Sequence, residues 1–139
     1  MKILVTGGCG YKGSVLIPEL LKSGNKVISF DTKWFGDNLK NHKNLENIKG
    51  DIRDTDSIPM QGVDSIIHLA NIANDPAVDL NPTLSWEVNV LASNKLADKA
   101  FRNGIKQIIF ASSGSVYGIK DEDKVTEDLE LVPISTYNK

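Results

Sequence analysis

The fold is decided by one stretch, Thr6-Gly7-Gly8-Cys9-Gly10-Tyr11-Lys12-Gly13. The apolar run before it, residues 2–5, predicts a buried parallel strand. The segment after it, residues 14–22, has apolar residues spaced as in a helix. A strand, a glycine-rich turn and a helix in this order are the context that a dinucleotide-binding fingerprint requires.

The glycines at positions 7, 10 and 13 each have a physical task in such a loop. Gly7 allows the tight turn out of the strand, Gly10 lets the backbone approach a pyrophosphate, and Gly13 lets the helix pack close to the sheet. The phosphates would then meet the free N–H groups at the helix N-terminus, where the helix dipole also favours anions. A glycine-rich turn that binds nothing is the alternative, and the rest of the chain decides between the two.

A second apolar segment, residues 26–31, predicts the next strand and ends in an acid, Asp31. A carboxylate at this strand end can accept hydrogen bonds from both ribose hydroxyls of an adenosine, and it repels a 2′-phosphate. Asp31 therefore favours NAD over NADP, a preference that Lys33 nearby would soften; the alternative for Asp31 is a turn residue at the strand end. Trp34 and Phe35 either flank an adenine or pack under the loop.

Five apolar segments predict strands, and they alternate with helical segments. They are residues 2–6, residues 26–31, a short strand and turn within 47–54, residues 63–70 and residues 106–113. This alternation predicts an α/β fold with a doubly wound, Rossmann-type parallel sheet. The right-handed crossover rule makes the strand order 3-2-1-4-5 the default.

Two segments between the last strands complete the pattern. Residues 71–81 are predicted to form a loop, with turn signals at Asp75-Pro76 and Asn81-Pro82. The loop leaves the sheet edge where α/β proteins bind ligands, which makes Asn74 and Asp75 candidate substrate contacts. Residues 83–103 are predicted to form one long amphipathic helix. Its apolar stripe comprises Leu84, Val88, Leu91, Leu96, Ala97, Ala100 and Phe101.

The composition narrows the class of protein. With 139 residues and a formal net charge of -2, the chain amounts to one domain, and its near-neutral balance argues against a nucleic-acid partner. A single cysteine argues against a disulfide framework and a zinc cluster, so no metal site is expected. No apolar run reaches membrane-spanning length and nothing resembles a signal peptide, so we expect no membrane partner and a cytoplasmic location.

The glycine loop, with Thr6 and Gly8 included, resembles the T-G-G-x-G-x-x-G loop of the extended short-chain dehydrogenase/reductase family, which includes nucleotide-sugar epimerases and dehydratases. The resemblance covers nearly the whole chain, residues 2–139. One departure is Lys12, which replaces a usually apolar residue and either contacts a phosphate or is solvated. The other matching segments follow in order along the chain: Asp31, Gly50-Asp51-Ile52, His68-Leu69-Ala70, Asn89, Ser112-Ser113-Gly114-Ser115-Val116-Tyr117-Gly118 and Tyr137.

The resemblance implies NAD as the cofactor and assigns its binding residues. In the family, the acid at Asp51 accepts a hydrogen bond from the exocyclic amine of adenine, and the backbone of Ile52 contacts the ring. Asn89 would lie beside the cofactor, although by itself the residue is equally a buried amide bonded to the backbone. His68 is expected to be a packed core residue rather than a base. The implied cofactor contacts are Gly7, Gly10, Tyr11, Lys12, Gly13, Asp31, Asp51, Ile52, Leu69, Ala70 and Asn89.

The resemblance also implies two catalytic residues, the hydroxyl of Ser113 and the general acid/base Tyr137. A free tyrosine has a pKa near ~10, too high for a base at neutral pH, and the family favours the phenolate with a lysine four residues later. Here that position is 141, and Lys139 would lie on the wrong side of a helix to replace it. Gly114 and Ser115 stand where sugar 4,6-dehydratases carry an acidic pair, which favours epimerisation or simple redox chemistry.

We therefore expect residues 1–139 to be an incomplete NAD-binding Rossmann domain, an N-terminal fragment without the last strands and the substrate domain. The parent protein is predicted to be an NAD-dependent epimerase or oxidoreductase that acts on a nucleotide-sugar, and to be a homodimer. The fragment itself is expected to bind NAD without turnover. The alternative is an NAD-sensing regulatory or binding module on the same fold, but such modules usually lose the tyrosine or the lysine, and this chain keeps Ser113 and Tyr137.

Overall fold

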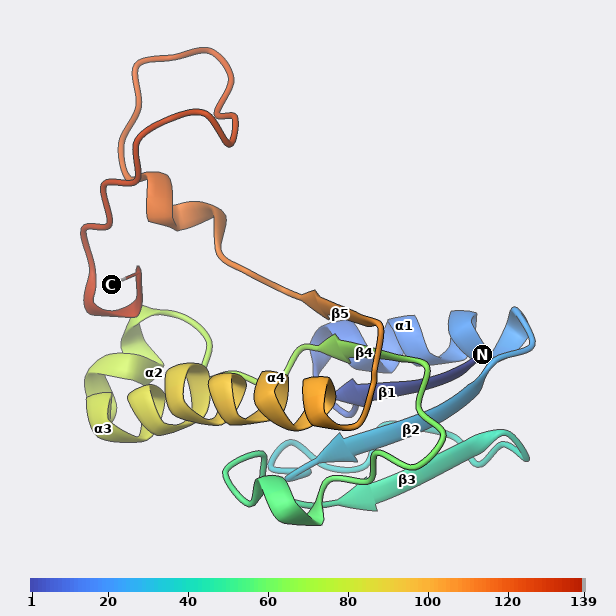
Figure 1. The fold of residues 1–139 in the computed structure, drawn as a ribbon. Helices are drawn as coiled ribbons and strands as arrows, with labels where there is room; N and C mark the ends of the chain where they lie inside the picture. The colour runs from blue at the N-terminus through green and yellow to red at the C-terminus, as the bar shows by residue number, and fades with distance from the viewer. Residues whose placement is uncertain (139) are drawn as a thin grey trace.

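The computed structural model describes residues 1–138 and contains a five-stranded parallel sheet with helices on both faces (Figure 1). The strands are β1 (Lys2–Thr6), β2 (Lys26–Asp31), β3 (Leu45–Lys49), β4 (Ser65–His68) and β5 (Gln107–Phe110). Their order in the sheet is β3-β2-β1-β4-β5, which confirms the predicted strand order and the Rossmann-type fold.

β3 begins before the segment that the sequence predicted and ends at Lys49. Its five residues pair in parallel with β2, from Val27 opposite Leu45 to Asp31 opposite Lys49. Residues 50–54 then leave the sheet in a tight turn, in which the Asp54 N–H donates to a carbonyl three residues earlier (3.0 Å). The turn, rather than the strand, therefore carries the acids of this segment.

The helices lie between the strands, before β2 and before β5. α1 (Tyr11–Lys22) follows the glycine loop as predicted. α2 (Asp75–Leu80) and α3 (Pro82–Ser85) follow β4, and a π-helical segment, Trp86–Ala92, joins α3 to α4 (Ser93–Arg102). The predicted helix over 83–103 is thus a continuous helical run whose middle is π-helical. Short 3-10 turns lie at Thr55–Ser57, Gly114–Tyr117 and Thr136–Asn138.

The prediction of a loop over 71–81 was wrong, because α2 occupies most of that segment. The side-chain oxygens of Asn74 and Asn81 each accept a hydrogen bond from the N–H group three residues later, at 3.1 and 3.0 Å, and so cap α2 and α3. Pro76 and Pro82 lie in the first turns of these helices. The asparagine and proline pairs are helix-start signals, since asparagine caps a helix and proline fits its first turn.

Each face of the sheet has its own hydrophobic core. Side chains alternate along β1, so Ile3 and Val5 pack with Ile17 of α1, while Leu4 packs on the opposite face with Leu96 of α4. The core on the α4 side is the larger one and extends over β2, β4 and the π-helical segment. The two cores fix the sheet between its helices and leave the strand ends free to build a site.

The buried stripe of the helical run differs from the predicted stripe. Leu91 is 44% exposed and Phe101 is 85% exposed, and Ala97 is also exposed. A π-helical turn joins residues five apart instead of four, so the apolar face moves from position 91 to position 92. The buried residues of the run are Ser85, Val88, Ala92, Leu96 and Ala100.

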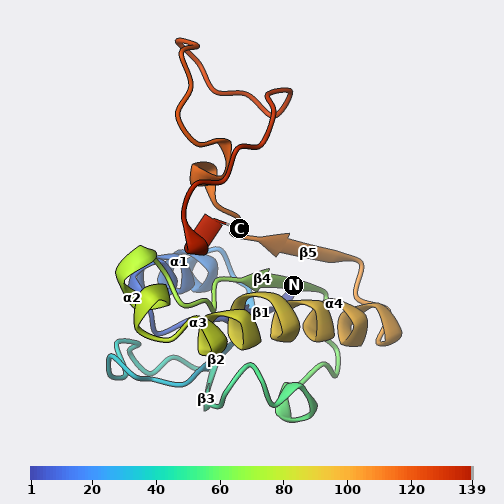
Figure 2. The same ribbon diagram turned by 90° about the vertical axis from the view of Figure 1, so that its left-hand side faces the viewer.

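The chain after β5 rises away from the sheet and then returns toward it (Figures 1 and 2). The final 3-10 turn, Thr136–Asn138, packs against α2. Every residue of β5 is exposed, and the apolar Ile108, Ile109 and Phe110 are 38%, 48% and 54% exposed. This edge of the sheet is therefore much less covered than β1, β2 and β4.

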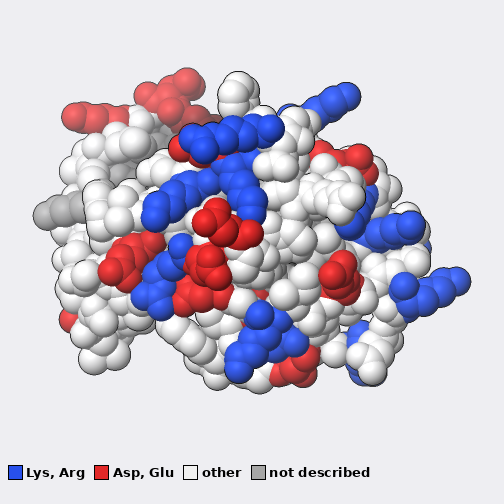
Figure 3. Space-filling view, turned by 60° about the horizontal axis from the view of Figure 1, so that its bottom comes forward, with Lys and Arg blue, Asp and Glu red and all other residues white. Residues whose placement is uncertain are grey.

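The surface carries no single-sign field on the face shown in Figure 3, where basic and acidic side chains are interspersed. None of the helices within residues 1–138 is long and apolar enough to cross a membrane. Within the same residues, no group of histidine, cysteine and acidic side chains could hold a metal ion.

Candidate functional site

A cavity of about 640 Å³ lies at the carboxyl ends of the strands, the edge where α/β sheets bind ligands. Its wall includes residues from the segments that follow all five strands. Tyr137 and Ser112 lie on the wall, whereas Ser113 and Asn89 do not. The implied cofactor contacts that line it are Gly7, Gly10, Tyr11, Lys12, Gly13, Asp31, Asp51, Ile52, Leu69 and Ala70.

The glycine loop folds tightly at two of its glycines. Gly7 has φ +72°, and a Cβ there would lie 2.6 Å from the backbone nitrogen of Ala70. A Cβ at Gly13 would lie 2.5 Å from the carbonyl oxygen of Gly8. The tight turn predicted at Gly7 is confirmed. At Gly13 the nearest atoms are the carbonyls of Gly7 and Gly8, directly after β1, so the lack of a side chain lets the start of α1 approach the end of this strand.

Gly10 differs from the other two glycines because a side chain there would be much less crowded by the protein itself. A Cβ there would meet only the carbonyl oxygen of Gly7, at 3.3 Å, and Gly10 lies on the cavity wall. No side chain within residues 1–138 caps α1, and no acid lies in its first turn. The N–H groups at the start of α1 are thus available to an anion, and Gly10 leaves space for its close approach.

Asp31 ties the glycine loop to the segment after β2. Its Oδ2 accepts a hydrogen bond from the Cys9 N–H (3.0 Å) and its Oδ1 accepts one from the Lys33 N–H (2.6 Å). An ionised carboxylate has about four acceptor positions, so two remain for ribose hydroxyls. The Lys33 ammonium is paired with Asp37 at 2.8 Å, which reduces the softening of the preference for NAD that the sequence led us to expect.

The aromatic pair in this segment does not pack under the loop. Trp34 is 59% exposed and Phe35 is 86% exposed, and both line the cavity. Of the two predicted alternatives, flanking an adenine is the one that this position allows. Cys9 of the glycine loop contributes to the same cavity wall but is buried, and burial raises the pKa of its thiol, so we regard it as a packing residue.

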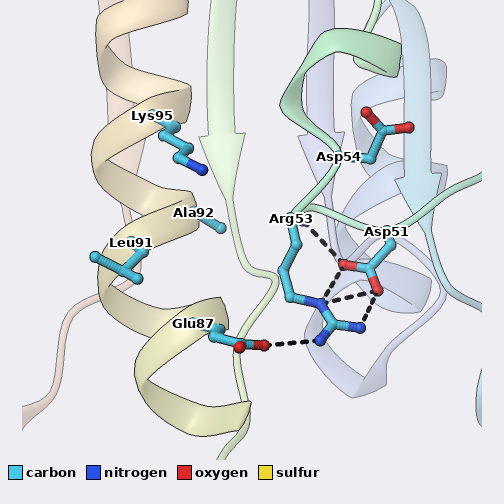
Figure 4. Close-up of a pocket in the computed structure, with 7 residues that line it drawn as sticks. All are labelled: Asp51, Arg53, Asp54, Glu87, Leu91, Ala92 and Lys95. Carbon is cyan, nitrogen blue, oxygen red and sulfur yellow. Dashed lines mark hydrogen bonds and ion pairs between the residues drawn. The ribbon is translucent and has the colours of Figure 1, made fainter. Parts of the chain in front are cut away.

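Asp51 lies on the cavity wall and is held from behind by Arg53 (Figure 4). The Arg53 guanidinium donates to both carboxylate oxygens, at distances down to 2.7 Å, and these hydrogen bonds lower the pKa of Asp51. Arg53 also pairs with Glu87 of the π-helical segment at 2.9 Å. Arg53 directly follows the matching segment Gly50-Asp51-Ile52, but nothing in the sequence identified Glu87 as its partner.

Asn89 supports the cavity wall without lining it. Its Oδ1 accepts from the Ile72 N–H (2.7 Å), and its Nδ2 donates to the Ile72 carbonyl (3.0 Å) and to Ser85 Oγ (3.2 Å). Ile72 itself lines the cavity. The amide therefore follows the backbone-bonding alternative, and a direct contact of Asn89 with a cofactor stays a prediction.

His68 is the packed core residue that the sequence predicted, with an exposed fraction of 2%. Ser93 Oγ donates to the Asn89 carbonyl (2.8 Å), so it accepts from His68 Nε2 (2.8 Å). Nδ1 then accepts from the hydroxyl of Thr6 (2.6 Å). Burial lowers the histidine pKa to about 4, so the ring is neutral at pH 7 and both of its nitrogens are already in hydrogen bonds.

The two implied catalytic residues are not brought together on the cavity wall. Tyr137 lines the cavity, but the hydroxyl of Ser113 is within 2.7 Å of Ser115 Oγ. Ser115 donates in turn to Asn138 Oδ1 (2.5 Å). Lys139 lies outside the described residues.

The cavity fits a dinucleotide on four independent features. It has uncapped helix N–H groups for a pyrophosphate, space at Gly10, a carboxylate with free acceptor positions at Asp31, and exposed aromatic rings for a base. The sequence missed the contacts of Arg53 with Glu87 and of Asn89 with Ile72, because each joins residues far apart in the chain.

Comparisons with known proteins agree with this geometry. The sequence model of the NAD dependent epimerase/dehydratase family matches residues 3–139. A UDP-glucose 4-epimerase from Lactobacillus helveticus is 32% identical over 143 residues, which cover 100% of this chain and 43% of that protein.

Two solved structures show the same fold at high similarity. UDP-N-acetylglucosamine 4-epimerase from Methanobrevibacter ruminantium M1, in complex with UDP-N-acetylmuramic acid, has a TM-score of 0.87 and 33% identity. The UDP-glucose 4-epimerase of Thermus thermophilus, in complex with NAD, has a TM-score of 0.87 and 28% identity. Each match covers 99% of this chain and 46% of the solved chain. The chain thus spans less than half the length of these three relatives.

Proposed function

Because the chain belongs to the NAD-dependent epimerase/dehydratase family, we propose that it forms the NAD-binding part of an enzyme that epimerises a nucleotide-sugar. The observation that carries this proposal is the convergence of the implied cofactor residues on one cavity, with Tyr137 on the same wall. Uridine diphosphate sugars are the proposed substrate class, because the relatives described above are 4-epimerases named for UDP-glucose and UDP-N-acetylglucosamine.

The cofactor roles follow from the positions of the residues around the cavity. The N–H groups at the start of α1 would bind the pyrophosphate, with Lys12 beside them. The Asp31 carboxylate would accept the adenosine ribose hydroxyls at its two free positions. Asp51 and Ile52 would meet the adenine, with Trp34 near the base.

The chemistry would be carried out by Tyr137 and Ser113. Tyr137 would take the proton of a sugar hydroxyl, and the Ser113 hydroxyl would hydrogen-bond the same oxygen as its carbon becomes a carbonyl. The bound cofactor supplies a hydride acceptor that can return the hydride to the opposite face of the sugar, which inverts the carbon. If the keto-sugar left before the hydride returned, the result would instead be a simple oxidation, with the hydride retained by the cofactor.

We also propose that these 139 residues alone bind NAD without turnover. Ser113 is bonded to Ser115 rather than directed at the cavity, and it would have to turn to reach a substrate. The lysine that the family places four residues after the tyrosine falls at position 141. The groups proposed to bind the pyrophosphate and the adenosine lie within residues 1–138 and involve neither feature.

An assay for C4 inversion of UDP-sugars tests the proposal. The whole protein that contains this chain should interconvert UDP-glucose and UDP-galactose, or the N-acetylated pair, while residues 1–139 should bind NAD and invert neither. Tight NAD binding by the whole protein with no inversion or oxidation of any UDP-sugar would favour the NAD-sensing module instead.

A homodimer of the whole protein and a cytoplasmic location belong to the same proposal. The exposed apolar side chains on the helical run, Trp86, Leu91 and Phe101, support the first. A single, buried cysteine supports the second, since reduced thiols are usual in that compartment. Sedimentation of the whole protein as a monomer would contradict the homodimer.

A further inference from the structure

Arg53 lies between two acids that belong to different elements (Figure 4). On one side, its Nε and Nη2 donate to Asp51 Oδ2 at 3.1 and 2.7 Å. On the other side, its Nη1 donates to Glu87 Oε2 at 2.9 Å. Asp51 follows β3 and Glu87 is part of the π-helical segment, so the arginine joins a loop to a helix across a groove that Lys95 also lines.

Asp51 is shared by this groove and the NAD cavity. Three N–H groups of Arg53 approach its carboxylate: Nε–H, Nη2–H and the backbone N–H, the last at 2.9 Å from Oδ1. An ionised carboxylate has about four acceptor positions, so about one is left for a donor that arrives from the cavity. The exocyclic amine of an adenine is a donor of this kind.

A base with a carbonyl in place of the amine would be disfavoured at the same position. Its oxygen would face a carboxylate oxygen, and two acceptors repel each other. A protonated carboxyl could resolve the conflict by donating, but Arg53 lowers the pKa of Asp51 and keeps it ionised. The arginine therefore fixes both the orientation of the carboxylate and its inability to donate.

The π-helical segment supports the cavity through three consecutive residues. Glu87 holds Arg53, Val88 lines the cavity directly, and Asn89 holds the wall residue Ile72. Glu87 thereby fixes the guanidinium from the side that Asp51 does not occupy, and a guanidinium held at both ends has little freedom to rotate away.

We propose that Arg53 and Glu87 are positioning residues that, through Asp51, make the cavity select a purine with an exocyclic amine. This inference rests on the proposed function, because it takes NAD as the ligand of the cavity. The competing explanation is that the Arg53 link between Asp51 and Glu87, called the structural link below, only stabilises the fold. In that case, removing it should lower the stability without any change in base selectivity.

The test compares two dinucleotides by titration of the purified chain. NAD carries the amine, and nicotinamide hypoxanthine dinucleotide carries an oxygen in its place. The wild type should prefer NAD by roughly tenfold or more, the usual value of a hydrogen bond to a charged acceptor. Arg53→Met, which keeps the length of the side chain but removes its donors, should reduce this preference to about threefold or less.

Three further variants separate positioning from structure. Glu87→Gln should give an intermediate preference, because Arg53 keeps Asp51 but loses its second anchor. Arg53→Lys should restore part of the preference, because the charge remains without the fork geometry. Lys95→Gln is the matched control, since Lys95 lines the same groove without an ion pair among residues 1–138, and it should keep the wild-type preference.

The outcomes separate this inference from the proposal on which it rests. If Arg53→Met binds both dinucleotides with the wild-type ratio, the positioning role is wrong while NAD binding stands. If the melting temperature of this variant falls but the ratio of its affinities for the two dinucleotides does not change, the structural link alone explains the role of Arg53. If the wild type binds neither dinucleotide, the proposed function fails and this inference fails with it.

Discussion

The two ends of the cavity are held in place very differently. At the end that we propose binds adenosine, called the adenosine end below, the Asp31 and Asp51 carboxylates are fixed by hydrogen bonds from neighbouring backbone and side-chain groups. At the reaction end, Ser113 is bonded to Ser115, and the adjoining strand β5 is exposed along its length.

This difference indicates which function each end can perform in residues 1–139. Groups that are already in place lose little freedom when a ligand binds, so the adenosine end is organised to supply affinity. Groups that must turn before they meet a substrate do not supply affinity in this state. We therefore expect binding and turnover to respond to different substitutions.

The strongest change is expected from a substitution at the reaction end, which should affect turnover but not NAD binding. Tyr137→Phe in the whole protein should lower the turnover of UDP-sugars by roughly 10²–10⁴-fold, because it removes the proposed general acid/base. The affinity for NAD should stay at the wild-type value. Steady-state kinetics and NAD titration of the same preparation measure both quantities, and turnover at the wild-type rate would end the assignment of this residue.

Acid should lower the stability of the whole domain, and so affect both ends of the cavity, because the buried His68 lies in the central part of the sheet, in β4. Its folded pKa of about 4 is below the value of about 6.5 expected for an unfolded chain. The histidine's contribution is thus fully present above pH 6.5 and is lost as the pH falls toward 4, since only the unfolded chain takes up a proton in that window. We expect a loss of about 2 kcal/mol in the free energy of unfolding between pH 7.5 and pH 5.

The measurement is urea unfolding of the wild type at both pH values, with His68→Gln as the control. The variant removes the titrating ring, so the acid-dependent loss should be smaller by the same amount. Equal losses in the wild type and the variant would mean that His68 is not the group responsible.

Substitutions at two glycines of the same loop should have different effects, one on stability and the other on NAD binding. Gly13→Ala should lower the free energy of unfolding by about 2 kcal/mol, because its Cβ would lie 2.5 Å from the Gly8 carbonyl oxygen. Gly10→Ala should leave the stability nearly unchanged and weaken NAD binding, because its Cβ would enter the cavity. Thermal melts and NAD titrations of both variants check this, and a stable Gly13→Ala protein would contradict the loop geometry.

The smallest expected effect concerns cofactor choice at the adenosine end. Asp37 holds the Lys33 ammonium at 2.8 Å, so Asp37→Asn should free the lysine to meet a 2′-phosphate. The affinity for NADP should rise by about threefold, the size of an exposed ion pair, with little change for NAD. Asp54→Asn serves as the control, since Asp54 does not line the NAD cavity. If the affinity for NADP rose equally in this variant, Lys33 would not be responsible for the change.

The sequence predicted the fold well because the strands carry local signals. Four of the five strands are short, mainly apolar runs, and the crossover rule then leaves few strand orders to consider. The polar β3 carries the weakest signal, and its start was placed two residues too late. The errors have equally local causes. The capped starts of α2 and α3 resemble turns in sequence, and the π-helical segment changes the period on which the apolar stripe was counted.

The candidate site was predictable only for residues whose position on the cavity follows from a single local motif. The glycine loop and Asp31 lie beside their own strands, so spacing alone placed them on one cavity. The partners of Arg53 and Asn89 are set by packing between distant elements, which no single segment encodes. Ser113 was assigned from its motif, but its partner Ser115 is in turn bonded to Asn138, a contact that depends on how the returning chain folds beside it.

Titration of the purified chain with NAD and with NADP is the measurement that tests the account most directly. The cavity at the strand ends should bind NAD, and it should bind NADP at least about tenfold more weakly, because the Asp31 carboxylate repels a 2′-phosphate. Asp31→Asn should weaken NAD binding and narrow the difference. Equal affinity for both dinucleotides, or no binding of either, would contradict the assignment of this cavity as an NAD site.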